Sequence, residues 1–193
     1  MAEFNGKIIL VTGGTGSFGG YFVKYLLDKN FEEIRVFSRD ELKQEDMRLK
    51  FQNPKINFHI GDVRDRDSVD EVMPGVDYVF HAAALKQVPT CEFFPMQATQ
   101  TNVLGSQNVI NSAIRHGVSR VVSLSTDKAV YPVNALGITK ALMEKVVQSA
   151  SRKLSEGQTV LSLVRYGNVL FSRGSVIPLF MKQIREKKPL TVT

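Results

Sequence analysis

Apolar and polar residues follow each other along this chain in blocks that predict strands separated by helices. Six apolar runs are short enough for buried strands, at 7–11, 34–38, 56–60, 78–82, 120–125 and 160–165. The stretches between them show helical spacing, near 17–29, 39–50, 65–73, 97–116, 134–153 and 175–187. This alternation predicts an α/β fold with a doubly wound parallel sheet and helices on both faces. Right-handed crossovers favour the strand order 3-2-1-4-5-6.

A glycine-rich turn joins the first predicted strand to the first helix in a G-x-x-G-x-x-G series. Glycine allows the backbone to turn tightly and to approach a pyrophosphate, which the N–H groups of the following helix then face. Strand, glycine turn and helix in this order predict a Rossmann-type dinucleotide site. The turn supplies six candidate cofactor-binding residues, which are Gly13, Thr15, Gly16, Ser17, Phe18 and Gly19.

The end of the second predicted strand bears on the choice of dinucleotide. Ser38 and Arg39 stand where an acidic residue would bind the ribose 2′-hydroxyl of NAD. A hydroxyl and a guanidinium suit a 2′-phosphate instead, so we expect NADP in preference to NAD. In the alternative interpretation, Arg39 is a solvated residue at the start of a helix and Asp40 binds the ribose.

Residues after the third and fourth predicted strands extend this expected site. Asp62 and Val63 are positioned to contact adenine, although Asp62 is equally suited to cap the helix that begins near Asp65. Small residues let a cofactor lie against the backbone at the end of the fourth strand, and three follow in succession: Ala82, Ala83 and Ala84. Lys86 then is either a ligand for substrate phosphate or sugar hydroxyls or a plain surface lysine. We interpret His81 as a packed residue at the strand end.

The fifth predicted strand delivers Thr126, Asp127 and Lys128 to the same edge. A neighbouring acid and lysine can act as acid and base if their pKa values move toward neutrality, and otherwise form a surface ion pair. On the next helix, Lys140 lies one turn after Leu136. Short-chain dehydrogenases usually carry Tyr-x-x-x-Lys there, and the tyrosine moves a proton. Leucine cannot, so the proton chemistry has to come from elsewhere.

Two further candidates follow the sixth predicted strand. Asn168 at its carboxyl end is a candidate ligand for substrate, and so is Ser175 at the start of the last helix. The N–H groups of the segment 172–178 are a candidate phosphate site.

Composition narrows the classes of protein. With 193 residues and 43% hydrophobic content, the chain can bury one sizeable core and is not a disordered protein. Its apolar runs are too short for a membrane span, and we expect a cytoplasmic protein because the first residues lack a signal sequence. The single Cys91 excludes an intrachain disulfide, and without a histidine or carboxylate cluster we expect no metal. The net charge of +6 comes from scattered residues, so we expect no nucleic acid partner.

Five motifs together are highly specific: residues 12–19, 36–41, 81–89, 125–130 and 165–169. They resemble the extended short-chain dehydrogenases of bacterial polysaccharide biosynthesis, specifically the inverting UDP-N-acetylglucosamine 4,6-dehydratases. One branch of that family keeps tyrosine at the position of Leu136, and another, which makes capsule and O-antigen sugars, has methionine. The leucine here resembles the second branch.

The resemblance implies a redox-neutral cycle on a UDP-sugar. NADP⁺ takes hydride from sugar C4, the new ketone acidifies C5–H, water is lost from C5 and C6, and hydride returns to C6. By resemblance Asp127 is the acid and Lys128 the base, while Thr126 and Lys140 orient substrate and nicotinamide. The family also implies a homo-oligomer and a substrate region largely beyond residue 193. We therefore expect 1–193 to be the NAD(P)-binding domain, with poor turnover alone.

Two other functions stay open. A 4-epimerase acting on UDP-glucose or UDP-N-acetylglucosamine would use the same fold and cofactor, but normally needs the tyrosine that is missing at position 136. A noncatalytic NADP-binding regulator would bind the cofactor without turning over any sugar nucleotide.

Overall fold

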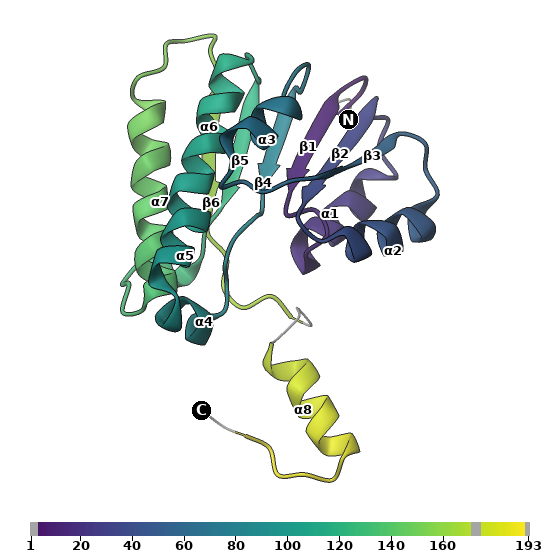
Figure 1. Cartoon of the computed structure of the whole chain (residues 1–193), viewed down its shortest axis with the longest axis vertical. Coiled ribbons are helices and arrows are strands. Elements are labelled where there is room, and N and C mark those ends of the chain that lie inside the picture. The colour runs from purple at the N-terminus through teal and green to yellow at the C-terminus, as the bar shows by residue number, and fades with distance from the viewer. Residues whose placement is uncertain (1–3, 171–174, 192–193) are drawn as a thin grey trace.

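The computed structural model describes residues 4–170 and 175–191, which form a single six-stranded sheet with helices on both faces (Figure 1). The strands are β1 (Ile8–Thr12), β2 (Glu33–Ser38), β3 (Ile56–Ile60), β4 (Tyr78–His81), β5 (Arg120–Leu124) and β6 (Val160–Val164). Every neighbouring pair is parallel, and the order is β3-β2-β1-β4-β5-β6. The predicted fold class and strand order are confirmed.

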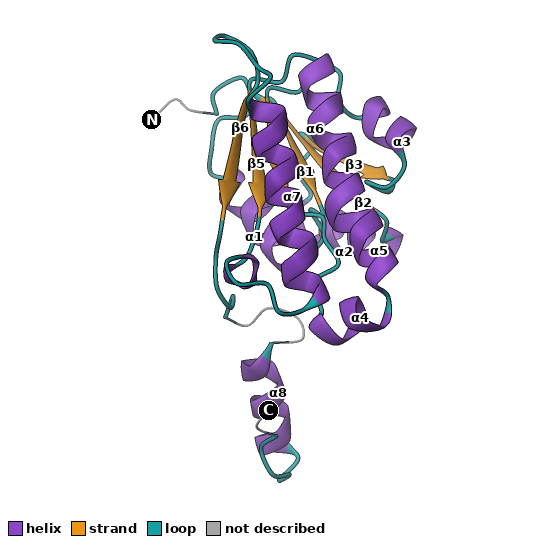
Figure 2. Ribbon diagram, turned by 90° about the vertical axis from the view of Figure 1, so that its left-hand side faces the viewer, coloured by secondary structure: helices purple, strands orange, loops and turns teal. Residues whose placement is uncertain are grey.

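The helices divide between the two faces of the sheet. Helices α1 (Ser17–Leu26) and α2 (Glu41–Phe51) cover one face, as Figures 1 and 2 show. The other face carries α3 (Arg66–Glu71), α5 (Pro95–Thr99), α6 (Gly105–Arg115) and α7 (Ala135–Ser151). Helix α8 (Val176–Arg185) stands apart from the sheet and buries none of its residues (Figure 1).

Alternation along the strands explains the continuous apolar runs. In β1, Ile9 and Val11 join the core under α1 and α2, whereas Leu10 joins the core under α3 and α6. Side chains of a strand point to opposite faces in turn, so a strand covered on both faces needs apolar residues at every position. The two cores lie on either side of the same sheet.

Three short elements were not predicted. The first is a π-helix, η1 (Gln100–Leu104), which divides the segment expected as one helix over 97–116 into α5 and α6. The other two are α4 (Val88–Phe93) and the 3₁₀ turn η2 (Asp127–Ala129). Helices α4 and α5 each carry a proline in the first turn, where its fixed φ suits a helix start. The sequence therefore held a signal for both. Of the segment proposed to receive phosphate, residues 172–174 lie outside the described residues.

A buried histidine joins β4 to its neighbours. His81 is 1% exposed, with Nδ1 2.7 Å from Thr12 Oγ1 and Nε2 2.8 Å from Ser106 Oγ. Ser106 Oγ donates its proton to Asn102 O, so it accepts from His81 Nε2–H, and Nδ1 accepts from Thr12. Burial, followed by the charge of Lys140, lowers the pKa of His81 to about 3. His81 is thus a neutral, packed residue, as interpreted from sequence.

This geometry predicts a pH-dependent stability. The pKa of His81 is about 3 in the folded chain, below its ordinary value of 6.5. The contribution of the neutral ring to the free energy of unfolding is therefore complete above pH 6.5 and is lost as pH falls toward 3. Between pH 7 and pH 5 the free energy of unfolding should fall by about 2 kcal/mol more in the parent than in His81→Gln, which cannot be protonated. Urea unfolding at a series of pH values measures this. Parallel losses in the two proteins would contradict it.

Candidate functional site

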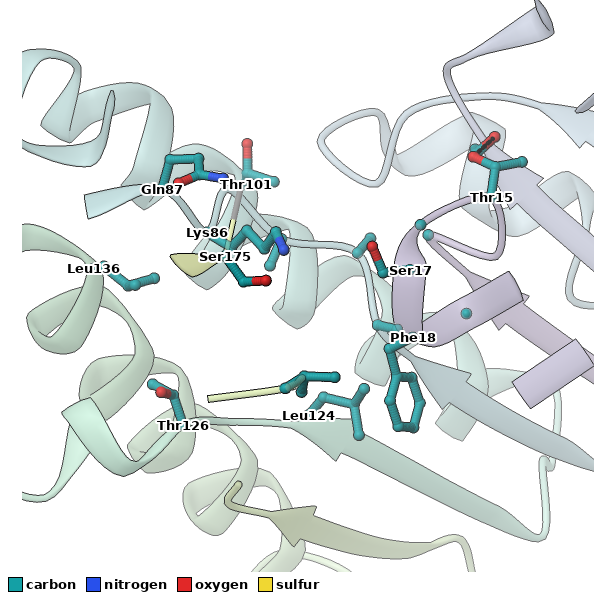
Figure 3. Close-up of a pocket in the computed structure, with 18 of the residues that line it drawn as sticks. Thr15, Ser17, Phe18, Lys86, Gln87, Thr101, Leu124, Thr126, Leu136 and Ser175 are labelled. Atoms are coloured by element: carbon teal, nitrogen blue, oxygen red, sulfur yellow. Dashed lines mark hydrogen bonds between the residues drawn. The ribbon is translucent and has the colours of Figure 1, made fainter. Parts of the chain in front are cut away.

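A cleft of about 1170 Å³ opens at the carboxyl edge of the sheet. Because all strands run parallel, the segments that follow the six strands meet at this edge, where the strand order reverses between β1 and β4. Figure 3 shows Thr15 and Ser17 toward one end of the cleft, Leu136 and Thr126 toward the other, and Lys86 between them.

The glycine turn forms one wall by direct backbone contact. Gly13 has φ +66°, and a Cβ there would lie 2.8 Å from the backbone of Ala83. A Cβ on Gly19 would lie 2.5 Å from Gly13 O. Both positions therefore exclude any side chain. The N-cap of α1 is Gly16, which makes no side-chain hydrogen bond to the helix, so the start of α1 is suited to face a phosphate. The turn fits a dinucleotide pyrophosphate.

The end of the cleft that follows β2 contains a buried hydrogen-bond network. Ser38 Oγ lies 3.1 Å from Thr15 Oγ1 and 3.2 Å from Nε2 of buried Gln44. Asp40 caps α2, accepting from Lys43 N at 3.1 Å. The Arg39 side chain is 55% exposed and reaches toward the cleft. Ser38 is thus held rigidly, while the guanidinium of Arg39 can reorient.

Asp62 is paired with arginines at the same end. Its Oδ2 lies 2.6 Å from Arg64 Nη2 and 3.4 Å from Arg39 Nη1. Burial alone would raise the pKa of Asp62, but hydrogen bonds from Arg64 and the charges of both arginines lower it. The interpretation of Asp62 as a helix cap is wrong, because Asp65 caps α3 by accepting from Asp67 N. The carboxylate of Asp62 instead lines the cleft.

A polar cluster lies at the ends of β5 and β6. Thr126 Oγ1 donates to Asp127 Oδ1 at 2.9 Å, and Lys128 Nζ donates to the same oxygen at 3.1 Å and to Asn168 Oδ1 at 3.2 Å. The hydrogen bonds from Thr126 and then Lys128 lower the pKa of Asp127. Asp127 is the one predicted site residue whose side chain does not line the cleft.

Helix α7 brings its first turn against this cluster. A Cβ on Gly137 would lie 2.4 Å from Lys128 O, so only glycine permits this approach of helix and loop. The preceding Leu136 is buried with Cys91 and Ala98, and it also lines the cleft. The residue at the usual tyrosine position is therefore a packed apolar wall.

Lys140 lies on the same helix, deeper in the fold. The residue is 6% exposed, and its ammonium donates to Leu124 O at 2.8 Å. Burial lowers the pKa of Lys140 to about 8, opposed by the negative charge of Glu144 and then by Cys91. The other predicted residues, among them Val63, Ala82, Ala84, Lys86 and Ser175, line the cleft as well.

Several cleft residues were missed from sequence. Tyr166 stacks on Phe18, with ring centroids 6.0 Å apart and planes within 9°, and so ties the end of β6 to α1. The chain pattern carries no signal for a contact between such distant residues. Thr101 lines the cleft from the π-helix, and Gln87, the N-cap of α4, lines it as well.

The part of the chain that the structure describes holds no group of three or more His, Cys, Asp or Glu side chains able to bind a metal ion. None of the helices described is both long and apolar enough to cross a membrane.

Comparisons with known proteins place the chain in a family. Residues 9–193 match the family model described as polysaccharide biosynthesis protein. A Rickettsia felis protein named UDP-glucose 4-epimerase is 60% identical over 194 residues, which cover 98% of this chain and 57% of that relative. A Rickettsia akari protein of the same name is equally similar. The chain thus spans little more than half the length of these relatives.

Solved structures match over almost the whole chain. Pen from Bacillus thuringiensis is 43% identical, with a TM-score of 0.95 over 98% of this chain and 59% of that one. DesIV from Streptomyces venezuelae, a dTDP-glucose 4,6-dehydratase solved with NAD and TYD, is 26% identical, with a TM-score of 0.84 over 95% of this chain and 63% of that one. Because the family model covers residues 9–193, the chain belongs to the polysaccharide biosynthesis protein family, on the fold of the short-chain dehydrogenases.

Proposed function

We propose that this chain binds NADP and carries the proton-transfer groups of a UDP-N-acetylglucosamine 4,6-dehydratase that inverts C5. The observation that supports this most is the cluster of Thr126, Asp127, Lys128 and Asn168 beside an apolar Leu136. The cluster supplies an acid and a base where the usual tyrosine is absent. The named activity of DesIV, a 4,6-dehydratase on the same fold, agrees with this proposal.

The cleft would hold the dinucleotide in one orientation, from the glycine turn to Lys140. The turn at Gly13–Gly19 would hold the pyrophosphate, Ala82–Ala84 would lie along the cofactor, and Lys140 would stand at the nicotinamide ribose. When bound, the cofactor would accept hydride from sugar C4 and later return it to C6. NADP is favoured because Arg39 is half exposed beside Ser38, where its guanidinium can turn from Asp62 to a 2′-phosphate.

The residues of the cluster would move protons at C5 and C6. Lys128 would take the C5 proton once C4 is a ketone, the C6–O bond would break, and Asp127 would donate the proton that releases the hydroxyl as water. As hydride returns to C6, a solvent-derived proton would reach C5 from the opposite face and so invert that centre. The lowered pKa of Asp127 means that it begins as a carboxylate. When substrate displaces the hydrogen bond from Thr126, the ammonium of Lys128 would pass a proton to the Asp127 carboxylate beside it. Asp127 would then be the acid, and the neutral amine of Lys128 would be free to take the C5 proton.

A 4-epimerase is the second candidate, favoured by the name of the 60% identical Rickettsia relatives. Both reactions begin with oxidation at C4, but only dehydration breaks the C5–H and C6–O bonds. The intact protein should therefore be incubated with UDP-N-acetylglucosamine in deuterated water, and the product examined by NMR. A 6-deoxy-4-keto sugar with deuterium at C5 supports the dehydratase. A C4 epimer with protium at C5 supports the epimerase, and cofactor binding without turnover supports a noncatalytic regulator.

The cofactor preference can be tested at Arg39. Arg39→Ala should weaken NADP binding by ~1.5–3 kcal/mol, roughly 10- to 150-fold, because a charge-assisted contact is lost, and should leave NAD binding almost unchanged. Calorimetry on the parent, on Arg39→Ala and on the control Arg48→Ala, which removes an arginine outside the cleft lining, measures both cofactors. Equal weakening of the two cofactors, or a parent that prefers NAD, would show that the assignment is wrong.

The base can be tested by deuterium exchange. Lys128→Ala should retain NADP binding but lose C5 exchange by roughly 10²–10⁴-fold, the usual contribution of a general base. Leu136→Met, which nearly preserves volume, should change exchange far less, because that side chain carries no proton. Both variants are compared with cofactor bound in the intact protein. Near-normal exchange in Lys128→Ala would remove this lysine from the mechanism.

A further inference from the structure

A buried carboxylate lies just behind the proposed site. Glu144 on α7 is 4% exposed and does not line the cleft. Its Oε1 accepts from Ser125 Oγ at 2.5 Å and from Arg165 Nε at 2.9 Å, and its Oε2 accepts from Arg165 Nη2 at 2.6 Å. A buried carboxylate is tolerated only when it is paired and hydrogen-bonded, and this two-point contact with arginine meets that requirement. The hydrogen bond from Arg165 is the main reason why the pKa of Glu144 lies below its ordinary value.

Glu144, Ser125 and Arg165 come from the three segments that carry Lys140 and the proposed acid–base cluster. Ser125 immediately precedes Thr126 in the segment that leads to Lys128, and Arg165 follows β6 in the segment that leads to Asn168. Two backbone bonds run beside the side-chain contacts, from Ser125 N to Val164 O at 2.7 Å and from Asp127 N to Tyr166 O at 3.0 Å. The side chain of Glu144 therefore fixes α7 to both loops at once.

Glu144 also lies one helical turn after Lys140, on the same side of α7. The ammonium of Lys140 is buried, and it donates a hydrogen bond to the neutral carbonyl of Leu124. Around it lie Glu144 on its own helix, Cys91 on α4 and His81 on β4. His81 is neutral, so Glu144 is the main negative charge that offsets the burial of this ammonium.

We propose that Glu144, held by Arg165 and Ser125, is a positioning residue that keeps buried Lys140 charged and aligns α7 with the loops after β5 and β6. The consequence for catalysis rests on the proposed function. The effect on Lys140 belongs to the chain alone and is measured without cofactor or sugar.

Lysine Cε labelled with ¹³C provides the measurement, by NMR titration of the 193-residue chain. The Lys140 signal is the one that disappears in Lys140→Met. In the parent its midpoint should be near pH 8. Glu144→Gln keeps the shape and removes the charge, so the midpoint should fall by about one unit, the lower end of the effect of an opposite charge within ~4–6 Å. Ser125→Ala removes one hydrogen bond and no charge, so it should shift the midpoint much less.

Arg165→Gln tests the same inference in the opposite direction. The Arg165 side chain is half exposed, so this variant should fold even if Glu144→Gln does not. Loss of the arginine leaves the charge of Glu144 uncompensated, and the midpoint of Lys140 should rise. An unchanged midpoint in folded Glu144→Gln, or in Arg165→Gln, would overturn the proposal. In the intact protein, the alkaline limb of the kcat profile should shift with the Glu144→Gln midpoint. If the titration shifts as expected but no sugar is turned over, the proposed function fails and this inference stands.

Discussion

Parallel pairing of all six strands is the constraint on which the rest of the molecule depends. It brings the carboxyl ends of all six strands to one edge, so segments that are distant along the chain share one cleft. It also requires every connection to cross the sheet through a helix, which buries both faces. The same geometry thus creates the two cores and the position of the cleft between the halves of the sheet.

Three buried titratable groups in or behind the cleft respond to burial in different ways. His81 has two hydroxyls as hydrogen-bond partners, one donating to its ring and one accepting from it, so the neutral ring is satisfied and its pKa falls to about 3. Glu144 is met by a guanidinium and stays charged. Lys140 lies between these cases, with a carbonyl as its hydrogen-bond partner and the Glu144 charge one turn away, and its pKa is about 8. Burial is the largest cause of the lowered pKa of His81 and of Lys140, whereas the hydrogen bond from Arg165 is the largest cause for Glu144.

Close backbone contacts shape the cleft as strongly as these charges. The glycine turn meets β4 at Ala83, and Gly137 lets α7 meet the carbonyl of Lys128. A methyl group at either place would separate two segments that have to lie together. In both cases one wall of the site depends on the absence of a side chain, and the functional groups stand on the backbone beside it.

The sequence by itself determined the strands, their order and the glycine turn, because these depend on local periodicity and on the few ways in which parallel units connect. The sequence also placed Lys128 and Lys140 at the carboxyl edge of the sheet, because Lys128 follows β5 and Lys140 lies on the next helix. Only the tertiary structure decided that Asp62 pairs with Arg64, that Asp127 lies beside the cleft lining, and that Glu144 joins Arg165. Such contacts depend on side-chain direction and on packing between distant segments, and the period of a single strand or helix carries neither.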